Sequence, residues 1–115
     1  MVICTFQMLF DPGLAIEATH LLQSLQGPVR SEPGCRGAFL YCEPGNMERI
    51  AWISRWENWD GFEKHVRNPR FRKLLGVLEM AALQPEILIE RSHEELGIDA
   101  IAGILLPADG NEDSM

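Results

Sequence analysis

The hydrophobic residues change their spacing several times along this chain, and each change predicts a different element. Val2 to Leu9 is apolar and rich in β-favouring residues, and it ends at an Asp-Pro-Gly turn signal. From Leu14 to Val29 the apolar residues fall at helical spacing. Gly27-Pro28 interrupts that spacing. Because proline removes a backbone donor and clashes with the preceding turn, we expect a kink or an early end near Gln26.

Two further short strands follow, close enough in sequence to form a hairpin. The first runs from Gly37 to Cys42 and the second from Arg49 to Trp56, with a Pro-Gly-Asn turn between them. The second strand has apolar side chains on both faces: Ile50, Trp52, Ser54 and Trp56 on one, and Ala51, Ile53 and Arg55 on the other. Both faces therefore need a cover. A layer of helices can provide only one.

The next segment predicts two helices and a last strand. Asp60 is the expected N-cap of a helix that reaches Arg67, and Asn68 followed by Pro69 begins a second helix. The apolar face of this second helix is expected at Phe71, Leu74, Leu75, Leu78 and Ala82. Glu86 to Arg91 is the fourth strand. The order βαββαβ predicts a ferredoxin-like α+β fold, an antiparallel sheet with two helices on one face.

Length and charge divide the chain into a body and a C-terminal extension. A chain of 115 residues is expected to form one domain, here residues 1–91. The net charge of −7 is uneven, because residues 92–115 hold six acidic residues and no Lys or Arg. Ile98 to Leu106 is too apolar for a solvated tail, so we expect residues 92–106 to pack on their own or a partner subunit. Residues 107–115 are acidic and expected to be disordered.

Half of the basic residues lie between Lys64 and Lys73. They predict either a solvated helix face or a surface that docks the acidic tail or steers an anionic ligand. The body as a whole, residues 1–91, is nearly neutral, which does not fit nucleic acid, since a basic face would be needed to neutralise phosphates.

The cysteines and the termini suggest a cytoplasmic protein. Cys4, Cys35 and Cys42 are odd in number and have no C-x-x-C spacing or nearby His pattern, which indicates reduced thiols that pack as small apolar residues. The first ten residues lack a basic start and a cleavage site, so a strand is expected there. No apolar run approaches the roughly 20 residues of a membrane-spanning helix, so no membrane contact is expected.

Several of these features together resemble a known family. They are the run Glu-Pro-Gly-Cys from Glu32, a strand that ends in Arg-Trp-Glu-Asn, and the pattern Phe-x-x-His-x-x-x-Pro-x-Phe from Phe62 to Phe71. This combination resembles the antibiotic biosynthesis monooxygenase family, over Met1 to about Arg91. The resemblance implies a homodimer of the dimeric α+β barrel group, whose open sheet faces meet. It also implies a substrate pocket between helices and sheet.

The family includes cofactor-independent oxygenases of aromatic and quinol substrates, haem-degrading enzymes and proteins that act on a signalling furanone. Haem-degrading members carry an iron-ligating His four residues after the position of Phe71, where this chain has Leu75. They also carry an Asn where it has Gln7, and only their pocket Trp has a match, in Trp56. These departures argue against haem degradation. Many members have a second His at the position of Arg70, so a mechanism that needs two imidazoles is not supported.

The candidate site residues are His65, His20, Trp52, Trp56, Ser54 and Gln7. The two histidines are candidate general bases, because imidazole titrates near neutral pH. The two tryptophans could form the walls of a pocket for a planar substrate, although large aromatic residues on a strand are more often core packing. The serine and the glutamine could orient a substrate oxygen.

The resulting hypothesis is a cofactor-independent monooxygenase acting on a small aromatic, phenolic or quinol-type molecule. The electron-rich substrate would itself reduce dioxygen, in a cleft that excludes water. The chain has no recognisable metal, flavin or nicotinamide motif, so no cofactor is expected. Two alternatives stay open: a non-catalytic small-molecule binding or sensing module of the same fold, and a furanone- or lactone-modifying enzyme.

Overall fold

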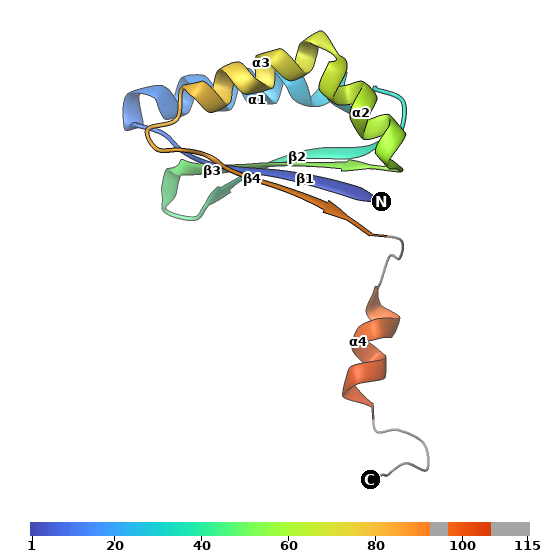
Figure 1. The fold of residues 1–115 in the computed structure, drawn as a ribbon. Coiled ribbons are helices and arrows are strands. Elements are labelled where there is room, and N and C mark those ends of the chain that lie inside the picture. Colours follow the sequence, from blue (N-terminus) through green and yellow to red (C-terminus); the bar gives the residue numbers. More distant parts are fainter. Residues whose placement is uncertain (93–96, 107–115) are drawn as a thin grey trace.

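A computed structural model of the chain describes residues 1–92 and 97–106. Its elements are β1 (Val2–Leu9), α1 (Pro12–Arg30), β2 (Cys35–Glu43), β3 (Asn46–Trp56), α2 (Trp59–Arg67), α3 (Pro69–Glu79), β4 (Glu86–Arg91) and α4 (Ile98–Leu105). The strands form one antiparallel sheet in the order β2-β3-β1-β4. Helices α1, α2 and α3 lie together on one face of it (Figure 1). The predicted ferredoxin-like α+β arrangement is confirmed.

Alternation along the central strands decides which side chains enter the core. The helix-facing residues of β1, and those of β3 from Ile50 onward, are buried, as the period-two pattern of β3 predicts. They are Val2, Cys4, Phe6, Met8, Ile50, Trp52, Ser54 and Trp56. Helix α1 packs Ala18, Leu22 and Val29 against them, and α3 adds Leu74 and Val77. This face of the sheet therefore carries the whole core.

Helix α1 does not end near Gln26, as expected from Pro28, but continues to Arg30. Proline in the last turn removes only one intrahelical hydrogen bond. The turn is closed by other donors, since both the backbone N–H and the side-chain hydroxyl of Ser31 donate to the carbonyl of Gly27, at 3.1 and 3.0 Å. The final turn is thus satisfied in spite of the proline.

The N-cap of α2 is Asn58 rather than the expected Asp60. Its side chain accepts a hydrogen bond from the N–H of Gly61 at 2.9 Å, so Asp60 falls within the first turn. Asn68 caps α3 as predicted, and accepts from the N–H of Arg70 at 2.9 Å. Asn68 also ends α2, which lets the two helices follow each other with a change of direction (Figure 1).

The second face of the sheet is apolar, and none of the described elements covers it (Figure 1). Strand register places Ile53 of β3 between Thr5 of β1 and Phe39 of β2. Thr5 is in turn opposite Leu88 of β4. Leu88 and Tyr41 are exposed there. This uncovered side is called the open face below.

Helix α4 stands away from the rest of its own chain, on the side of the open face (Figure 1). Its large apolar residues are between 52% and 82% exposed. The radius of gyration is 18.1 Å, above the ~13 Å expected for a compact chain of this length, because α4 projects outward. None of the described helices is long and apolar enough to cross a membrane. Residues 107–115, expected to be disordered, lie outside the described residues.

The shared cap at Asn68 generates a first prediction. Replacing Asn68 with Ala should lower the free energy of unfolding by about 1 kcal/mol, because the N–H of Arg70 loses its acceptor. Urea unfolding followed by circular dichroism measures the change. Ser24→Ala, on the exposed surface of α1, serves as the control and should change it by less than about 0.5 kcal/mol. Equal effects of the two substitutions would contradict the capping role.

Candidate functional site

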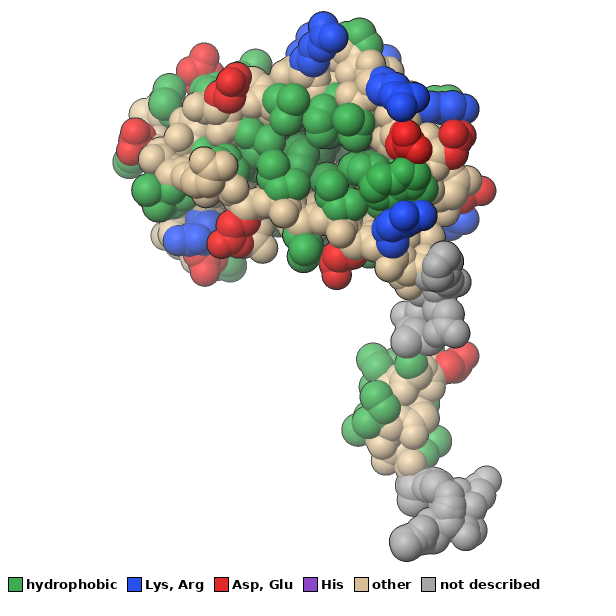
Figure 2. Space-filling view, viewed as in Figure 1, with side chains coloured by type: hydrophobic (Ala, Val, Ile, Leu, Met, Phe, Trp, Pro, Cys, Tyr) green, Lys and Arg blue, Asp and Glu red, His purple; other side chains and the backbone are tan. Residues whose placement is uncertain are grey.

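An apolar cleft lies between α2 and α3 on one side and β1 and β4 on the other. It exists because β4 is an edge strand that the helices cover incompletely. Ile87 and Ile89 point toward the helix layer, yet they are 53% and 44% exposed. Figure 2 shows an apolar area in the middle of this face, with charged side chains around it. The cleft has a volume of about 450 Å³, a size typical of small-molecule sites.

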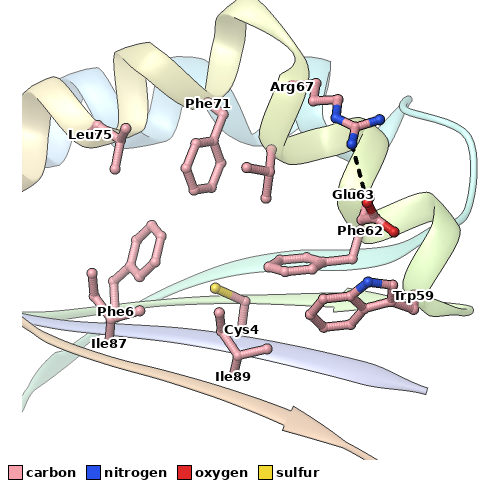
Figure 3. Close-up of a pocket in the computed structure, with 11 residues that line it drawn as sticks. Cys4, Phe6, Trp59, Phe62, Glu63, Arg67, Phe71, Leu75, Ile87 and Ile89 are labelled. Atoms are coloured by element: carbon pink, nitrogen blue, oxygen red, sulfur yellow. Dashed lines mark hydrogen bonds and ion pairs between the residues drawn. The ribbon is translucent and has the colours of Figure 1, made fainter.

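The side chains that line the cleft come from both layers and point toward one another (Figure 3). They are Cys4, Phe6, Trp59, Phe62, Glu63, Val66, Arg67, Phe71, Leu75, Ile87 and Ile89. The ring of Phe6 meets that of Phe71 edge to face at 6.2 Å, and Trp59 is tilted against Phe62 at 5.3 Å. Aromatic pairs in these orientations hold each other in place. The walls suit a flat, apolar molecule.

The charged residues among these are Glu63 and Arg67, both on α2. Arg67 donates to Glu63 at 3.3 Å (Figure 3). Since Arg67 is largely exposed, this pair stabilises the fold little, and its guanidinium can contact a ligand. The Arg91 guanidinium lies 4.5 Å from the centre of the Trp59 ring, at the same end of the cleft. An anionic group on a ligand could therefore pair with the guanidinium groups at this end of the cleft.

Cys4 presents a thiol to the floor of the cleft (Figure 3). Burial raises the pKa of this thiol to about 12. The thiolate is the nucleophilic form of cysteine, and it is scarce at neutral pH in such a site. Cys4 therefore acts as an apolar wall residue, as the sequence predicts.

A buried polar network lies behind the aromatic wall. Glu32, in the turn after α1, accepts a hydrogen bond from His65 Nδ1 at 2.9 Å and one from Arg70 Nη1 at 3.2 Å. The side chains of His65 and Glu32 are 1% and 5% exposed. A carboxylate so far from water requires such partners. We assign the ring proton to Nδ1, because a carboxylate can only accept, which leaves Nε2 as the basic nitrogen.

The imidazole of His65 connects this network to the cleft. It stacks on Trp56 with 4.3 Å between ring centres, and meets Phe71 edge-on at 5.2 Å. Phe71 also lines the cleft, so its ring contacts the imidazole of His65 on one side and the interior of the cleft on the other. Burial lowers the pKa of His65, and it outweighs the opposing effect of the Glu32 carboxylate. His65 is therefore neutral at neutral pH, and its contact with Glu32 is a hydrogen bond to a carboxylate rather than an ion pair.

Glu32 is a residue whose place in the site the sequence did not reveal. It appeared there only as the start of the Glu-Pro-Gly-Cys run. Gly34 in that run has a φ of +82°, which favours glycine, and its carbonyl accepts from the N–H of Glu57 at 2.8 Å. The turn is thus tied to the end of β3, and this brings Glu32 to the helix that carries His65. An acidic residue within the motif was the available signal, but its partners are 33 and 38 residues away.

The two tryptophans of β3 lie in the core and not among the residues that line the cleft. Trp56 reaches the cleft only through its contacts with Phe62 and His65. Ser54 accepts a hydrogen bond from Trp56 Nε1 at 3.0 Å, so this hydroxyl holds an indole. The Nε1 atom of Trp52 is buried and has no hydrogen-bond partner among the described residues. The expected tryptophan-walled pocket is displaced toward β4.

Gln7 and His20 lie away from the cleft. Gln7 is on the open face, next to Ala51 in the register, so its amide does not face the cleft, which its candidate role as a substrate-orienting residue requires. The physical reason is the alternation of β1, in which Phe6 and Met8 take the helix-facing positions. His20 is exposed on α1, in a shallow hollow with Thr19 that the cleft does not reach. The structure thus brings His65, Trp56 and Ser54 together, and leaves these two apart.

The burial of His65 generates a second prediction, on pH. Above the ordinary value of 6.5 the imidazole is neutral in both the folded and the unfolded chain, and its contribution is complete. As the pH falls below 6.5, the unfolded chain takes up a proton before the folded one does, because the folded pKa is lowered. The free energy of unfolding should therefore decrease as the pH falls through this range, until the folded pKa is passed.

Urea unfolding from about pH 7.5 to about pH 5.5 tests this, since the range spans the ordinary histidine pKa. The matched variant is His65→Gln, which keeps a donor for Glu32 and cannot titrate there. Its stability should depend less on pH than that of the wild type. Glu32 and Arg70 remain in both proteins, so the difference isolates the imidazole. Equal pH dependence of the two proteins would refute the prediction.

Within the described residues, no group of three or more His, Cys, Asp or Glu side chains is placed to hold a metal ion. A search of curated proteins finds no match. Solved structures do match. A candidate antibiotic biosynthesis monooxygenase from Deinococcus radiodurans is 17% identical, with a TM-score of 0.75 over 84% of this chain and 97% of that one. Rv0793 from Mycobacterium tuberculosis is 18% identical, with a TM-score of 0.73 over 84% and 98%.

A variant of SnoaB, a cofactor-independent oxygenase from Streptomyces nogalater, is 16% identical, with a TM-score of 0.68 over 83% of this chain and 95% of that one. At these identities the likeness shows the fold. The sequence model of the antibiotic biosynthesis monooxygenase family matches residues 1–75, which is more than half of the chain and includes Glu32, His65, Arg70 and Phe71. The chain therefore belongs to the antibiotic biosynthesis monooxygenase family.

Proposed function

We propose that this protein is a cofactor-independent monooxygenase that acts on a small phenolic or quinol-type aromatic molecule in the apolar cleft. The observation that carries the proposal is the cleft itself. It has the volume for such a molecule, aromatic walls made by Phe6, Phe62 and Phe71, and a cation, Arg67, at one end. Family membership supports monooxygenation, and the description of SnoaB supports independence from a cofactor.

In the proposed reaction a phenol with a C–H group para to its hydroxyl first loses a proton. The phenolate transfers one electron to dioxygen, and the phenoxyl radical and superoxide combine at the para carbon, with proton uptake, to give a hydroperoxide. Loss of water from this hydroperoxide breaks the O–O bond and removes the C–H proton, which leaves a carbonyl. One oxygen atom is thus kept in a quinone and the other leaves as water, and the substrate supplies all four electrons.

In this reaction some residues bind the substrate, and one residue accepts the proton of its hydroxyl group. Arg67 would stabilise the phenolate, because a nearby cation favours the anionic form. The aromatic walls would exclude water from the radical pair. His65 is the base of the proposal, because its neutral imidazole can accept a proton at Nε2. Its ring is reached when Phe71 moves aside, since Phe71 contacts both the ring and the cleft.

Turnover by metal-free protein tests this proposal. Oxygen uptake and quinone absorbance are measured with a panel of phenols and quinols, and one dioxygen should be consumed per quinone formed. His65→Gln should lower kcat by roughly 10²- to 10⁴-fold, the usual contribution of a general base. His20→Gln is the matched control and should leave kcat unchanged, because His20 is remote from the cleft. Unchanged kcat in His65→Gln would remove His65 from the reaction.

The cleft can be filled independently of the chemistry. Leu75→Trp places a large ring in the cleft, and should abolish both ligand binding and turnover. Leu83→Trp, exposed after α3 and outside the cleft, is the matched control. Normal turnover in Leu75→Trp would show that the reaction takes place elsewhere.

A second candidate, a small-molecule binding or sensing module, is favoured by one observation. Neither His65 nor His20 is among the residues that line the cleft, so a bound molecule would not touch an imidazole without a rearrangement. Thermal shift with the same panel separates the two candidates. Stabilisation that Leu75→Trp removes, without oxygen uptake by any compound, is the signature of binding alone.

We also propose that the protein is an isologous homodimer whose open faces meet. Isolated apolar sheet faces of this kind are unfavourable in water, and Ile53, Phe39 and Leu88 would be covered in such a dimer. Light scattering should give twice the 13.0 kDa mass of one chain. Ile53→Glu, in the middle of the open face, should give monomers. Ile16→Glu, on the exposed side of α1, is the control and should remain dimeric. A monomeric wild type would contradict the proposal.

A further inference from the structure

Helix α4 has the composition of a buried helix but is exposed in its own chain. Ile98, Ile101, Ile104 and Leu105 share one face of the helix, within an arc of about 120° at 3.6 residues per turn, and Asp99 is its single charged residue. An apolar helix face of this kind normally packs against another surface. Figure 2 shows these apolar side chains at the surface, well separated from the body. Something outside the described protomer must cover them.

The position of α4 indicates what that is. The sheet is seen edge-on in Figure 1, with α1, α2 and α3 on one side and α4 on the other. Sheets that pack face to face are ~10 Å apart. A second copy on the open face would therefore occupy the space alongside α4. The cleft of the same protomer, by contrast, is on the helix side of the sheet, away from α4.

The reach of the segment is sufficient. Four residues, 93–96, can span at most about 14 Å. The eight residues of α4 add about 12 Å. Together they exceed the ~10 Å between two packed sheets, so α4 can pass the edge of a partner's sheet and arrive at the partner's helix layer.

The partner's cleft offers the matching surface. It is apolar and incompletely closed at β4, where Ile87 and Ile89 are half exposed. Two basic residues, Arg67 and Arg91, lie at one end of it, while residues 92–115 carry six acidic residues and no basic ones. Apolar surface meets apolar surface, and opposite charges flank it. Such complementarity specifies how two surfaces pair.

We propose that α4 of each protomer packs on a second copy of this chain, across the open side of that copy's cleft between β4 and α3. Each site is then completed in trans, and its ligand is enclosed by the other subunit's Ile101 and Leu105. The inference shares its cleft with the proposed function and its dimer with the open-face proposal, but does not depend on turnover.

Cross-linking tests the contact directly, in full-length protein with the exposed Cys42 replaced by Ser and the cleft-lining Cys4 replaced by Ala. Ile101→Cys is made in one preparation, and Leu75→Cys, with a size tag, in another. The two are mixed, allowed to exchange subunits and oxidised. A covalent heterodimer of intermediate size on a non-reducing gel is the expected result, because Leu75 lies at the mouth of the cleft. Ile16→Cys, exposed on α1, replaces Leu75→Cys in the matched control and should give no such band.

Contact within one chain is distinguished by the double variant Ile101→Cys/Leu75→Cys. An intrachain disulfide that leaves it monomeric on the gel, with no heterodimer in the mixing experiment, would overturn the proposal. So would an absence of any cross-link to Leu75→Cys. Sedimentation of the wild type with phosphatidylcholine vesicles, lost in Ile101→Asp, would assign α4 to a lipid surface and would equally overturn it. Because none of these readouts requires turnover, they separate this inference from the proposed reaction.

A second readout tests closure of the cleft. Ile101→Asp/Leu105→Asp should increase the fluorescence of an apolar naphthalene-sulfonate dye, because the cleft loses its cover. Adding Leu75→Trp, which fills the cleft, should remove that increase. Dye binding that is unchanged by the aspartates would show that α4 does not cover the cleft.

Discussion

Both faces of the four-stranded sheet are apolar, but one chain supplies helices for only one of them. This imbalance governs the rest of the structure. On the helix side, Trp52 and Trp56 of β3 are fully buried and form the centre of the core. On the other side, Ile53 and Phe39 have no described cover. The helix layer is also narrower than the sheet, and the part of β4 that it leaves bare becomes the floor of the cleft.

In this chain two residues of the family motif, His65 and Arg70, are part of the polar network behind the cleft. Where many members have a second histidine, Arg70 donates to the carboxylate that also holds His65. Because the side chain of Glu32 is buried, it needs both of these hydrogen-bond donors, so the three residues constrain one another. Glu32 thereby orients the imidazole, and Trp56 stacks on it. The presence of His65 in the motif is thus explained by packing as well as by any chemistry.

The same network links distant parts of the chain. Glu32 follows α1, and both of its partners are in the α2–α3 segment. Phe71, immediately after Arg70, contacts His65 on one side and Phe6 on the other. A change in the hydrogen bonds of this network would therefore shift Phe71 and alter the aromatic wall of the cleft. The proposed base and the proposed binding surface are mechanically connected through this one ring.

The hydrophobic pattern predicted the structure correctly wherever a single periodicity determines which way the side chains point. The alternation in β3 correctly divides Trp52 from Ile53, because successive side chains in a strand must point to opposite faces. The predicted helix ends were less accurate than the predicted strand faces. Asn58 competes with Asp60 as a cap two residues apart, and hydrogen bonds from Ser31 carry α1 past Pro28. In each case two local signals conflicted, and contacts formed in the fold decided between them.

The sequence by itself determined the order of elements as far as β4, the faces of the central strands and the family, because these depend on periodicity and on short spacings along the chain. Only the tertiary structure decided where the cleft lies and what lines it. It moved the pocket from Trp52 toward Ile87, put Gln7 on the opposite face and joined Glu32 to His65. These facts depend on which strand is at the edge, how far the helices extend over it, and which residues meet across more than thirty positions of chain. No local period encodes such distances.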